Sequence, residues 1–526
     1  MTEKKQKKLT KLNDYWINRA KKRIAEDIRD TEMVVELINN QYDLALSRIE
    51  KDIATLFYRY SSDNELSYTQ AIELLTSDEY KEFRMDLASY MAEIDDPNIL
   101  LELNTLSTKS RITRLERTFY DIQKEVDKTY IYQHKEVEDL MQHTLNNSYK
   151  KTLFNIAVGE NITKKSYHML TKKEILKEFE KPWSGKNFSQ RIWNNRTKLK
   201  DALEEEIIQA AIQGTNTSEA VKRVQDKFKV SKKNATRLIR TEQSYFSSLG
   251  NLKAFKELGV EEYIYIATLD LRTSNICRDL DHEVFKREEA IIGVKFPPMH
   301  PNCRSTTAPY TGELKGTRIA RDENGKNIRV DKNINYKQWH KEYVESNPNY
   351  IIEEKKWKNR HSDKRQYKKY KDVGVEVPKS FDKYQDLKYN GSERDRRLRM
   401  VDYTRRVKLK NNPELKLPNV GTATIDKNKF EKYLFAGDNE KGLNKGRLIE
   451  EKLGYNIDNY DKFEKEILSR AKYYPATLRG TTTYGQRYEQ QIIFYNKNKE
   501  PVNVLVAWLE NNGKTHMSTA YITEVK

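Results

Sequence analysis

The chain has 526 residues, a mass of 62.3 kDa and a formal net charge of +18. This length exceeds what one ordinary hydrophobic core organises, so a single-domain protein is excluded and several domains are expected. Charged residues make up 33% of the chain, but 33 Tyr and 16 Phe argue against full disorder. The positive charge favours a polyanion or an acidic partner, with a lysine-rich solvated surface as the alternative.

The N-terminus predicts neither export nor membrane insertion. MTEKKQKKLTKLNDYW begins with basic residues, but no apolar run follows, so it is not a signal peptide. No stretch approaches the roughly 20 apolar residues that a membrane span needs. We therefore expect a soluble protein made in the cytosol, with no membrane partner. In that reducing compartment a structural disulfide is disfavoured.

Residues 1–200 are expected to be mainly helical. Proline and glycine are absent before Pro97, which removes the usual helix breakers. From residue 13 to about 60, apolar residues recur every three or four positions, as on one face of a long amphipathic helix. The segment 67–83 predicts two short capped helices, and 108–150 predicts another long helix. KPWSGKNFSQRIWNNR then predicts a turn followed by an aromatic-anchored helix.

Residues 201–312 predict a small domain with both helices and strands. The part from 217 to 259 predicts three helices, the middle of which superficially suggests a DNA-binding helix-turn-helix. Short helical hairpins are also common core units, and that is the preferred interpretation. EEYIYIATLD, at 261–270, predicts a short β-rich run leading into the next segment.

The segment 270–309 concentrates residue types that the rest of the chain avoids. Both cysteines, Cys277 and Cys303, lie in it, with His282 and His300 beside them. Four of the 12 prolines also fall in this stretch. Such a concentration requires a local reason, and metal binding or a rigid cross-linked loop are the two obvious ones.

The spacing of these residues suits one structural, tetrahedral Zn²⁺ ion, which prefers thiolate and imidazole ligands. The candidate ligands are Cys277, His282, His300 and Cys303, with Asp281 as an alternative to His282. The second pair lies in PPMHPNCRS, where proline restricts the backbone and preorganises the ligands. A packed turn with one buried cysteine and a strained disulfide are the competing interpretations. A catalytic cysteine is not favoured, because no separate base is marked.

Two segments follow this domain. Residues 313–420 crowd charged residues together with weak apolar periodicity, and predict a basic linker, partly helical and partly mobile. Residues 421–526 predict an α+β module. Three short helices precede strand-like runs at 486–496, 502–510 and 515–522, an order that predicts an antiparallel meander.

The C-terminal module offers residues for RNA cleavage without a metal. That reaction needs a base for the ribose 2′-OH, an acid for the leaving oxygen and cations for the phosphate. His516 is the sole histidine of the module and suits either proton transfer. Strand alternation predicts one face with His516, Ser518 and Ala520, and the other with Met517, Thr519 and Tyr521. The phosphate-binding candidates are Ser518, Thr519, Tyr521, Lys441, Lys445, Arg447, Arg479 and Arg487. Each is an ordinary exposed polar residue in the competing interpretation.

DLRTSNICRDLD followed by FPPMHPNCRSTTAPY resembles the phage Mu protein F-like minor head proteins, a family also described by its phage head morphogenesis domain. The family pattern falls on Asp270, Arg272, Thr273, Cys277, Leu280, Asp281, Pro297, Pro298, His300, Pro301, Cys303 and Arg304. Many members have a further cysteine where this chain has Ser274, which weakens a four-cysteine metal site. RLIRTEQ, at 237–243, and the helical N-terminus also resemble minor head proteins of phages that infect Gram-positive bacteria.

This resemblance covers roughly residues 10–310 and implies a bacteriophage virion protein. It implies a minor capsid component near the portal, needed for head assembly in the host cytoplasm and not enzymatic in this part. The portal protein and the major capsid or scaffold protein are the implied partners, and packaged DNA is the expected ligand of the basic surface. The rival is a bacterial polymorphic toxin that carries a phage-like trafficking domain.

The C-terminal module resembles the barnase/EndoU/colicin/RelE-like nuclease fold, by its helices, its meander and the ending THMSTAYI. That resemblance implies a toxin-like RNase attached to the head protein, with RNA as substrate. A module that only binds capsid or nucleic acid is the alternative. An ADP-ribosyltransferase is another, and it is disfavoured because no Glu-x-Glu motif is recognised.

Overall fold

The computed structural model describes residues 3–60, 65–160, 166–312, 314 and 316–525. The chain divides into two compact units, residues 1–343 and 344–526, and each is described by itself. The expected multidomain architecture is confirmed, with helices in the N-terminal part and small antiparallel sheets. Within the described part of the chain, no helix is both long and apolar enough to cross a membrane.

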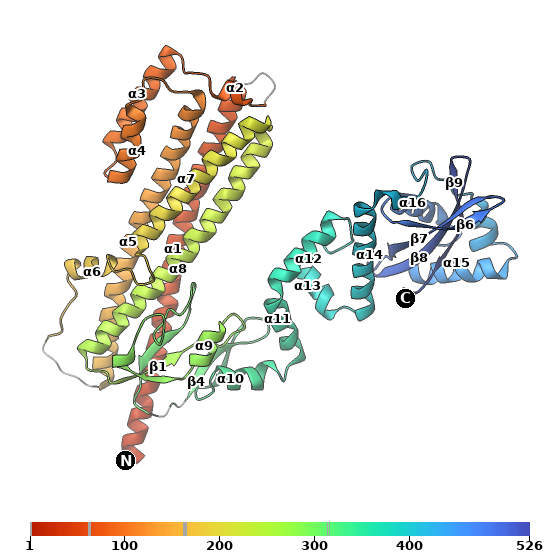
Figure 1. The fold of residues 1–526 in the computed structure, drawn as a ribbon. Helices are drawn as coiled ribbons and strands as arrows, with labels where there is room; N and C mark the ends of the chain where they lie inside the picture. Colours follow the sequence, from red (N-terminus) through yellow and green to blue (C-terminus); the bar gives the residue numbers. More distant parts are fainter. Residues whose placement is uncertain (1–2, 61–64, 161–165, 313, 315, 526) are drawn as a thin grey trace. The chain divides into compact units, whose positions relative to one another are not determined.

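Four long helices lie side by side and form the body of the first unit (Figure 1). They bury apolar residues at spacings of three and four; in the first helix Tyr42, Ala45, Ile49 and Ile53 are fully buried. The four are α1 (Glu3–Tyr60), α5 (Arg114–Glu160), α7 (Phe188–Gln213) and α8 (Thr217–Glu257). The predicted long helices near 13–60 and 108–150 are therefore confirmed.

The prediction of three helices between 217 and 259 is wrong, because α8 is one continuous helix. It begins at Asn216, whose side chain accepts a hydrogen bond from the backbone of Glu219, and no glycine or proline interrupts it before Gly250. Gly214, in the left-handed conformation that terminates helices, ends α7 and lets the chain reverse into α8. The two helices thus form a tight antiparallel hairpin, and the helix-turn-helix is absent.

Small residues let α5 and α8 approach closely. A Cβ atom at Gly250 would lie 2.7 Å from the carbonyl oxygen of Leu145. The hydroxyls of Ser148 and Ser247 lie 3.0 Å apart, and Thr152 donates to the Asn251 side chain at 2.7 Å. The crossing is therefore held by backbone proximity and by satisfied buried polar groups.

Short helices complete the helical part. The expected pair within 67–83 is confirmed, and each helix begins with a capping box, at Ser67 and at Thr76. The short helices are α2 (Tyr68–Ala71), α3 (Ser77–Ala92), α4 (Pro97–Ser107) and α6 (Lys172–Phe179).

A small three-stranded antiparallel sheet, in the order β2-β1-β3, packs against the bundle. Its strands are β1 (Glu262–Ile266), β2 (Val284–Lys286) and β3 (Thr306–Pro309), and α9 (Asn275–Leu280) and η1 (Arg287–Glu289) connect them. A hairpin of β4 (Thr317–Arg321) and β5 (Asn327–Asp331) follows, with α10 (Tyr336–Trp339) and the short π-helix η2 (His340–Val344). The β-rich run predicted at 261–270 is thus confirmed as β1.

The predicted linker at 313–420 is folded, which corrects its description. Besides β4, β5 and α10 it contains α11 (Pro348–Lys358), α12 (Arg360–Asp372), α13 (Phe381–Asn390), α14 (Glu393–Asn411) and η3 (Pro413–Leu415). Tyr370, Val375 and Tyr384 form a small buried cluster there. The weak apolar periodicity of the sequence missed this core because tyrosines supply much of it.

The C-terminal module contains the predicted helices and a meander of four strands, in the order β6-β7-β8-β9. The helices are η4 (Phe430–Leu434), α15 (Glu440–Leu453) and α16 (Tyr460–Ala471). The strands are β6 (Ala476–Thr482), β7 (Gly485–Tyr495), β8 (Pro501–Asn511) and β9 (Lys514–Ile522). The sequence predicted only the last three, because β6 lies at the sheet edge, is mostly exposed and contains Gly480.

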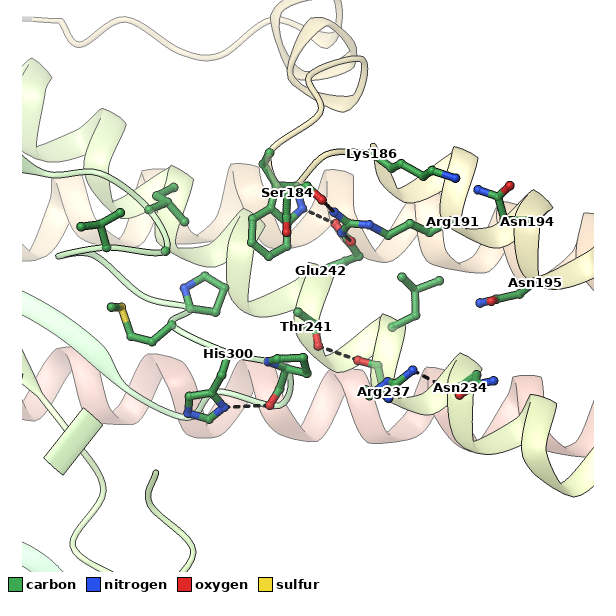
Figure 2. A pocket seen from close by; sticks show the side chains of 18 of the residues that line it. Ser184, Lys186, Arg191, Asn194, Asn195, Asn234, Arg237, Thr241, Glu242 and His300 are labelled. Atoms are coloured by element: carbon green, nitrogen blue, oxygen red, sulfur yellow. Dashed lines mark hydrogen bonds and ion pairs between the residues drawn. The ribbon is translucent and has the colours of Figure 1, made fainter. Parts of the chain in front are cut away.

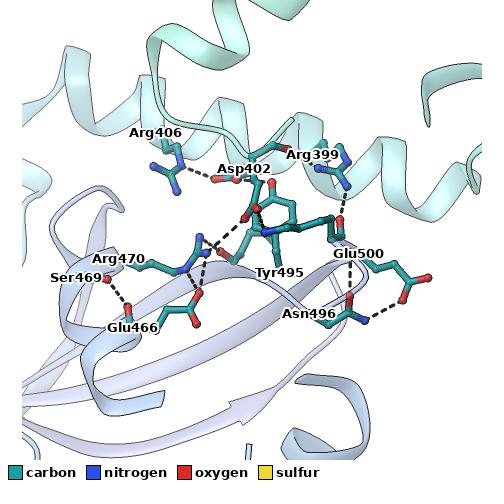
Figure 3. A network of polar contacts seen from close by, with 12 residues as sticks. Arg399, Asp402, Arg406, Glu466, Ser469, Arg470, Tyr495, Asn496 and Glu500 are labelled. Atoms are coloured by element: carbon teal, nitrogen blue, oxygen red, sulfur yellow. Dashed lines mark hydrogen bonds and ion pairs between the residues drawn. The ribbon is translucent and has the colours of Figure 1, made fainter. Parts of the chain in front are cut away.

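Helix α14 belongs to this module, although the sequence placed it in the linker (Figure 3). Its fully buried Asp402 accepts hydrogen bonds from Arg406 Nε at 2.6 Å, from the Tyr474 hydroxyl at 2.5 Å and from the Tyr495 hydroxyl at 2.7 Å. Arg405 of the same helix donates to the Asn503 side chain at 2.6 Å. Because Tyr495 and Asn503 lie on strands of the meander and Tyr474 lies just before its first strand, the module begins before residue 421.

Candidate metal centre

The two cysteines are brought together by a short helix and a loop. Cys277 lies in the first turn of α9, whose N-cap Ser274 accepts a hydrogen bond from the Cys277 backbone at 3.4 Å. His300 and Cys303 lie on the loop that follows Pro298 and leads into β3. The Cys303 backbone N–H donates to the His300 carbonyl at 3.1 Å, and Asn302 between them has a positive φ of 59°. This tight turn directs both side chains toward α9.

The ligand atoms of Cys277, His300 and Cys303 all lie within 4.8 Å of one another. The Cys277 sulfur is 3.8 Å from the Cys303 sulfur and 3.4 Å from His300 Nε2. In a tetrahedral zinc site, with Zn–S of about 2.3 Å and Zn–N of about 2.0 Å, the corresponding edges are about 3.8 Å and about 3.5 Å. The three residues therefore fit a metal ion at its coordination distances. The cysteines are free thiols, which excludes the disulfide interpretation in this structure.

Hydrogen bonds orient the His300 ring and favour the thiolate form of Cys277. His300 Nδ1 donates to the Pro301 carbonyl at 2.9 Å, which leaves the Nε2 lone pair directed at the cysteines. Hydrogen bonds from Cys303 and His300 lower the pKa of the Cys277 thiol far below its ordinary value. The same contact with Cys277 raises the pKa of His300. A cation placed between these groups would bind the thiolate forms.

His282 and Asp281, predicted as alternative fourth ligands, are not part of this group. His282 Nε2 lies 2.6 Å from Arg318 Nη1, and burial lowers the pKa of His282 to about 4. Asp281 accepts two hydrogen bonds from Arg318, at 2.8 and 3.0 Å, and one from the Ala267 backbone at 2.7 Å. Both side chains serve a buried ion pair instead. The buried Tyr265 hydroxyl is closer to the cluster, 3.2 Å from the Cys277 sulfur.

The remaining polar residues of the motif hold the loops in place. Arg304 binds the Asp270 carboxylate with two hydrogen bonds, at 2.6 and 2.8 Å. Burial raises the pKa of Asp270, but the pair with Arg304 outweighs burial and leaves the pKa below its ordinary value. Thr273 donates to the Thr268 carbonyl and to Asp270. The loops before α9 and after Cys303 are thereby fastened to each other.

Sequence reasoning missed Arg318 and Tyr265. Arg318 lies on β4, beyond the motif, and is only 2% exposed. Nothing in its local sequence distinguishes it from other arginines of a basic segment. Tyr265 had a usable signal, since β1 leads directly into the motif and alternate residues of a strand share one face.

In the C-terminal module, a β-bulge changes the predicted faces of β9. The register shifts opposite Ala507 and Trp508, so Ser518 is an extra residue. Met517 and Ala520 are both buried, whereas His516 and Ser518 are exposed. The predicted grouping of His516 with Ala520 on one face is therefore wrong. Past the bulge, Thr519 and Tyr521 follow the face of His516.

The phosphate-binding candidates on α15 do not gather around His516. Lys445 donates to Thr519 Oγ1 at 3.3 Å and to the Tyr433 hydroxyl at 3.2 Å, and its ammonium group lies 5.0 Å from the centre of the Tyr521 ring. Lys441 and Arg447 are exposed on α15, and among the described residues no hydrogen bond or ion pair joins them to His516.

The sheet register places Arg487 and His516 in one row. Arg487 pairs with Leu509, and Leu509 pairs with His516. Two rows further along, and so on the same face, Glu489 pairs with Ala507, which pairs with Thr519. Arg479 forms an ion pair with Glu489 at 2.8 Å. Sequence reasoning missed Glu489, a carboxylate on the same face as His516.

The expectation that no Glu-x-Glu motif is present is wrong, because Glu464 to Glu466 form such a triplet, on helix α16 rather than on a strand. Glu466 accepts hydrogen bonds from Arg470, at 2.7 Å, and from Tyr455. These contacts make Glu466 part of the support behind the sheet.

Comparisons with known proteins match two parts of the chain. Residues 201–308 match the family model described as Phage Mu protein F like protein. Residues 416–524 match a domain of unknown function, DUF6883, so the nuclease-fold resemblance of the module is not confirmed. No solved structure matches the chain.

One curated relative is NAD(+)--arginine ADP-ribosyltransferase EFV of Enterococcus faecalis (strain ATCC 700802 / V583). It is 27% identical to this chain over 180 residues, which is 32% of this chain and 36% of that protein. The chain thus spans about a third of the length of that relative. The family match covers the bundle hairpin, the small sheet and the Cys/His cluster, and it identifies residues 201–308 as a phage Mu F-like head morphogenesis domain.

Proposed function

We propose that the chain is a bacteriophage minor head protein that acts in head assembly near the portal, where portal and major capsid or scaffold protein are its partners. The observation that carries the proposal is the family match over residues 201–308, whose cysteines and histidine meet in one cluster. The match lies in the first unit, where long helices support the small sheet. Such a rigid body suits a structural role.

Gene deletion tests this proposal. The phage is grown without the gene and then with a plasmid copy, and DNA-filled heads are counted by electron microscopy. The proposal requires that deletion sharply lowers the yield of filled heads and that the wild-type copy restores it. Normal yields of infectious particles after deletion would contradict a role in assembly and favour the freestanding toxin.

We further propose that Cys277, His300 and Cys303 hold a structural Zn²⁺. The ion would link α9 to the loop before β3, much as a disulfide would, but in a reducing cytoplasm. The cluster is largely buried, with Cys277 and Cys303 at 1% and 5% exposure, which suits a structural rather than a catalytic site. Tyr265 is the candidate for support of the Cys277 thiolate by a hydrogen bond.

For the C-terminal module we propose phosphodiester cleavage, with RNA as substrate, as a second function. The supporting observation is the sheet row that places Arg487 and His516 on the face that also carries Glu489. Neighbouring strands are about 4.8 Å apart, so the Arg487 and His516 backbones are separated by about 10 Å, a span that one phosphodiester group and two side chains can bridge. Glu489 would act as base and His516 as acid.

The assay for this second function uses the purified full-length chain, RNA and EDTA. Cleavage by the wild type that His516→Ala removes, and that His361→Ala retains, supports the assignment; His361 is an exposed histidine of the same unit. A parallel assay with NAD⁺ and an arginine acceptor covers the activity in the relative's name. Intact RNA in every sample would contradict the RNase and leave the module as a binding domain.

A further inference from the structure

A cleft of about 790 Å³ opens between α7, α8 and the loop that carries His300 (Figure 2). Cationic and amide side chains line it from both helices. Lys186, just before α7, and Lys198, within it, contribute on one side, and Arg237 of α8 contributes on the other. Asn194 and Asn195 of α7 and Asn234 of α8 add amide side chains to the same two walls. The cleft therefore presents donors on facing walls.

The cleft carries positive charge that the protein does not neutralise. Within the described part of the chain, Lys186, Lys198 and Arg237 form no ion pair with a carboxylate. Glu242 is the one carboxylate among the described lining residues. It is fully buried and accepts hydrogen bonds from Arg191 and from Trp183 Nε1, the latter at 2.9 Å. Its charge is thus already matched inside the wall.

Other cations of α8 form ion pairs with carboxylates of neighbouring helices, unlike the cations that face the cleft. Lys232 is paired with Asp43 at 2.7 Å, Arg240 with Glu32 at 2.7 Å and Lys227 with Glu206 at 3.0 Å. These pairs fasten α8 to α1 and α7. The cations that face the cleft have no such structural task.

The cationic surface continues beyond the cleft. A second groove shares Asn234 and Arg237 with it and adds Lys229 and Lys233. Lys229, Lys233 and Arg237 are exposed and occur at intervals of four residues on α8. At 1.5 Å per residue, neighbouring charges are about 6 Å apart along the helix axis. The result is a line of single positive charges leading into the cleft.

We infer that this line and the cleft together bind the phosphodiester backbone of a nucleic acid, without reading its bases. A regular row of single cations matches a regular row of single phosphate charges, and the side-chain amides can donate to phosphate or sugar oxygens. An acidic protein segment would also need positive charges on this surface. Its carboxylates have no regular spacing, so they would not require evenly spaced cations along the helix. The even spacing and the amides favour nucleic acid.

The inference deepens the proposed function and rests on it for the biological setting, because a head protein works beside packaged DNA. The binding itself is a property of the purified chain. Loss of binding would leave the assembly role untouched, and failure of the assembly role would leave the binding measurable. The nucleic-acid binding and the assembly role can therefore be disproved independently of each other.

The test is fluorescence anisotropy with the full-length chain and labelled 20-nucleotide probes of duplex DNA, single-stranded DNA and RNA. Five cations predict a slope of log K against log salt of roughly −3 to −5. In the double variant Lys198→Glu/Arg237→Glu, affinity should fall at least about tenfold and the slope should shrink by about 2. A preference for one probe type identifies the natural polymer. Binding of any of the three supports the inference, because all three have a phosphodiester backbone.

The matched control is Lys135→Glu/Lys150→Glu. It makes the same change in net charge at two exposed lysines of α5 outside both grooves. The inference predicts near wild-type binding for the control, with unchanged circular dichroism and zinc content in both variants. An equal loss of affinity in both double variants would overturn the inference, because it would show that binding depends only on the net charge of the chain. Binding of a labelled poly-glutamate peptide, with no binding of the three nucleic-acid probes, would also overturn the inference.

Discussion

At the scale of single residues, the Cys/His cluster depends on groups that never touch a metal. Asp270 and Arg304 fasten the two loops, and Asn302 makes the turn that brings His300 beside Cys303. Arg318 neutralises Asp281 beneath the site. Removing a ligand and removing a neighbouring residue should therefore have different consequences.

Substitution of a ligand tests the metal directly. In Cys303→Ser, the soft thiolate ligand is lost, and we expect zinc content to fall from about one ion per chain to near zero, with a lower melting temperature for the first unit. Inductively coupled plasma mass spectrometry and calorimetry measure both. His282→Gln is the matched control and should retain zinc. Full zinc content in Cys303→Ser, or its loss in His282→Gln, would contradict the assigned ligands.

Lys21 of α1 offers a prediction with a defined pH dependence. Burial, and then the charges of Arg318 and Lys332, lower the pKa of Lys21 from 10.5 to about 7. As the pH falls from 10.5, the unfolded chain binds this proton before the folded chain does, so the lysine costs increasing stability down to about pH 7.

Lys21→Met should therefore stabilise the first unit by about 2–4 kcal/mol at pH 7, and by much less near pH 10. Thermal unfolding at the two pH values measures the difference. Lys22→Met, one position along the same helix, serves as the control and should show little change. A stabilisation by Lys21→Met that does not depend on pH would show that packing, rather than the charge, is responsible.

Three of the four predicted ligands meet in one cluster, and their residue types made them visible in the sequence. Cysteine and histidine are rare in this chain, so their gathering within 40 residues was visible without a structure. The choice of His282 was wrong because spacing does not reveal direction. With a positive φ of 72°, His282 turns toward Arg318 and away from Cys277.

At the scale of elements, the crossing of α5 and α8 rests on close backbone contact. Gly250→Ala adds a methyl group that would meet Leu145 O at 2.7 Å and the Tyr149 backbone nitrogen at 2.9 Å. Alanine favours a helix by about 1 kcal/mol over glycine, but here two helix backbones must separate to make room.

We expect Gly250→Ala to lower the free energy of unfolding by about 1–3 kcal/mol in spite of the better helix propensity. Urea unfolding followed by circular dichroism is the measurement. Lys222→Ala, at an exposed position of the same helix, should leave stability within about 0.5 kcal/mol. A stabilised Gly250→Ala variant would show that the helices are not in close contact at this point.

Helix α14 gives a second prediction at this scale, based on its buried Asp402 (Figure 3). Asp402→Ala removes the acceptor of three hydrogen bonds and leaves the Arg406 charge buried without its partner, which should cost about 3–5 kcal/mol in the second unit. Tyr495→Phe removes one of the three bonds and should cost about 1 kcal/mol. Equal, small losses in chemical denaturation would contradict the account of α14 as part of the module.

Helix and strand patterns predicted most elements but not their ends or their registers. The three helices expected within 217–259 are one, in which the polar Ser247 is buried against Asp27 of α1 and Ser148 of α5 rather than placed in a turn. The bulge at Ser518 was not predictable, since alternation counts residues and cannot reveal an extra one. Strand β6 escaped detection because an exposed edge strand needs no apolar face.

At the scale of the whole molecule, the chain joins two folded units of different kinds. The first carries the phage Mu F-like domain on a long helical bundle, and the second carries a helix-supported meander that matches a family of unknown function. The proposed roles in head assembly, zinc binding and nucleic-acid binding belong to the first unit, and the proposed RNA cleavage belongs to the second.

The central claim is that this chain is a component of the virion, and quantitative mass spectrometry of purified particles tests it most directly. Phage particles are banded in a density gradient, treated with protease to remove adhering host protein, and then disrupted and digested. The account predicts peptides from both units, in few copies per particle relative to the major capsid protein. Absence of these peptides from mature, infectious particles would contradict it.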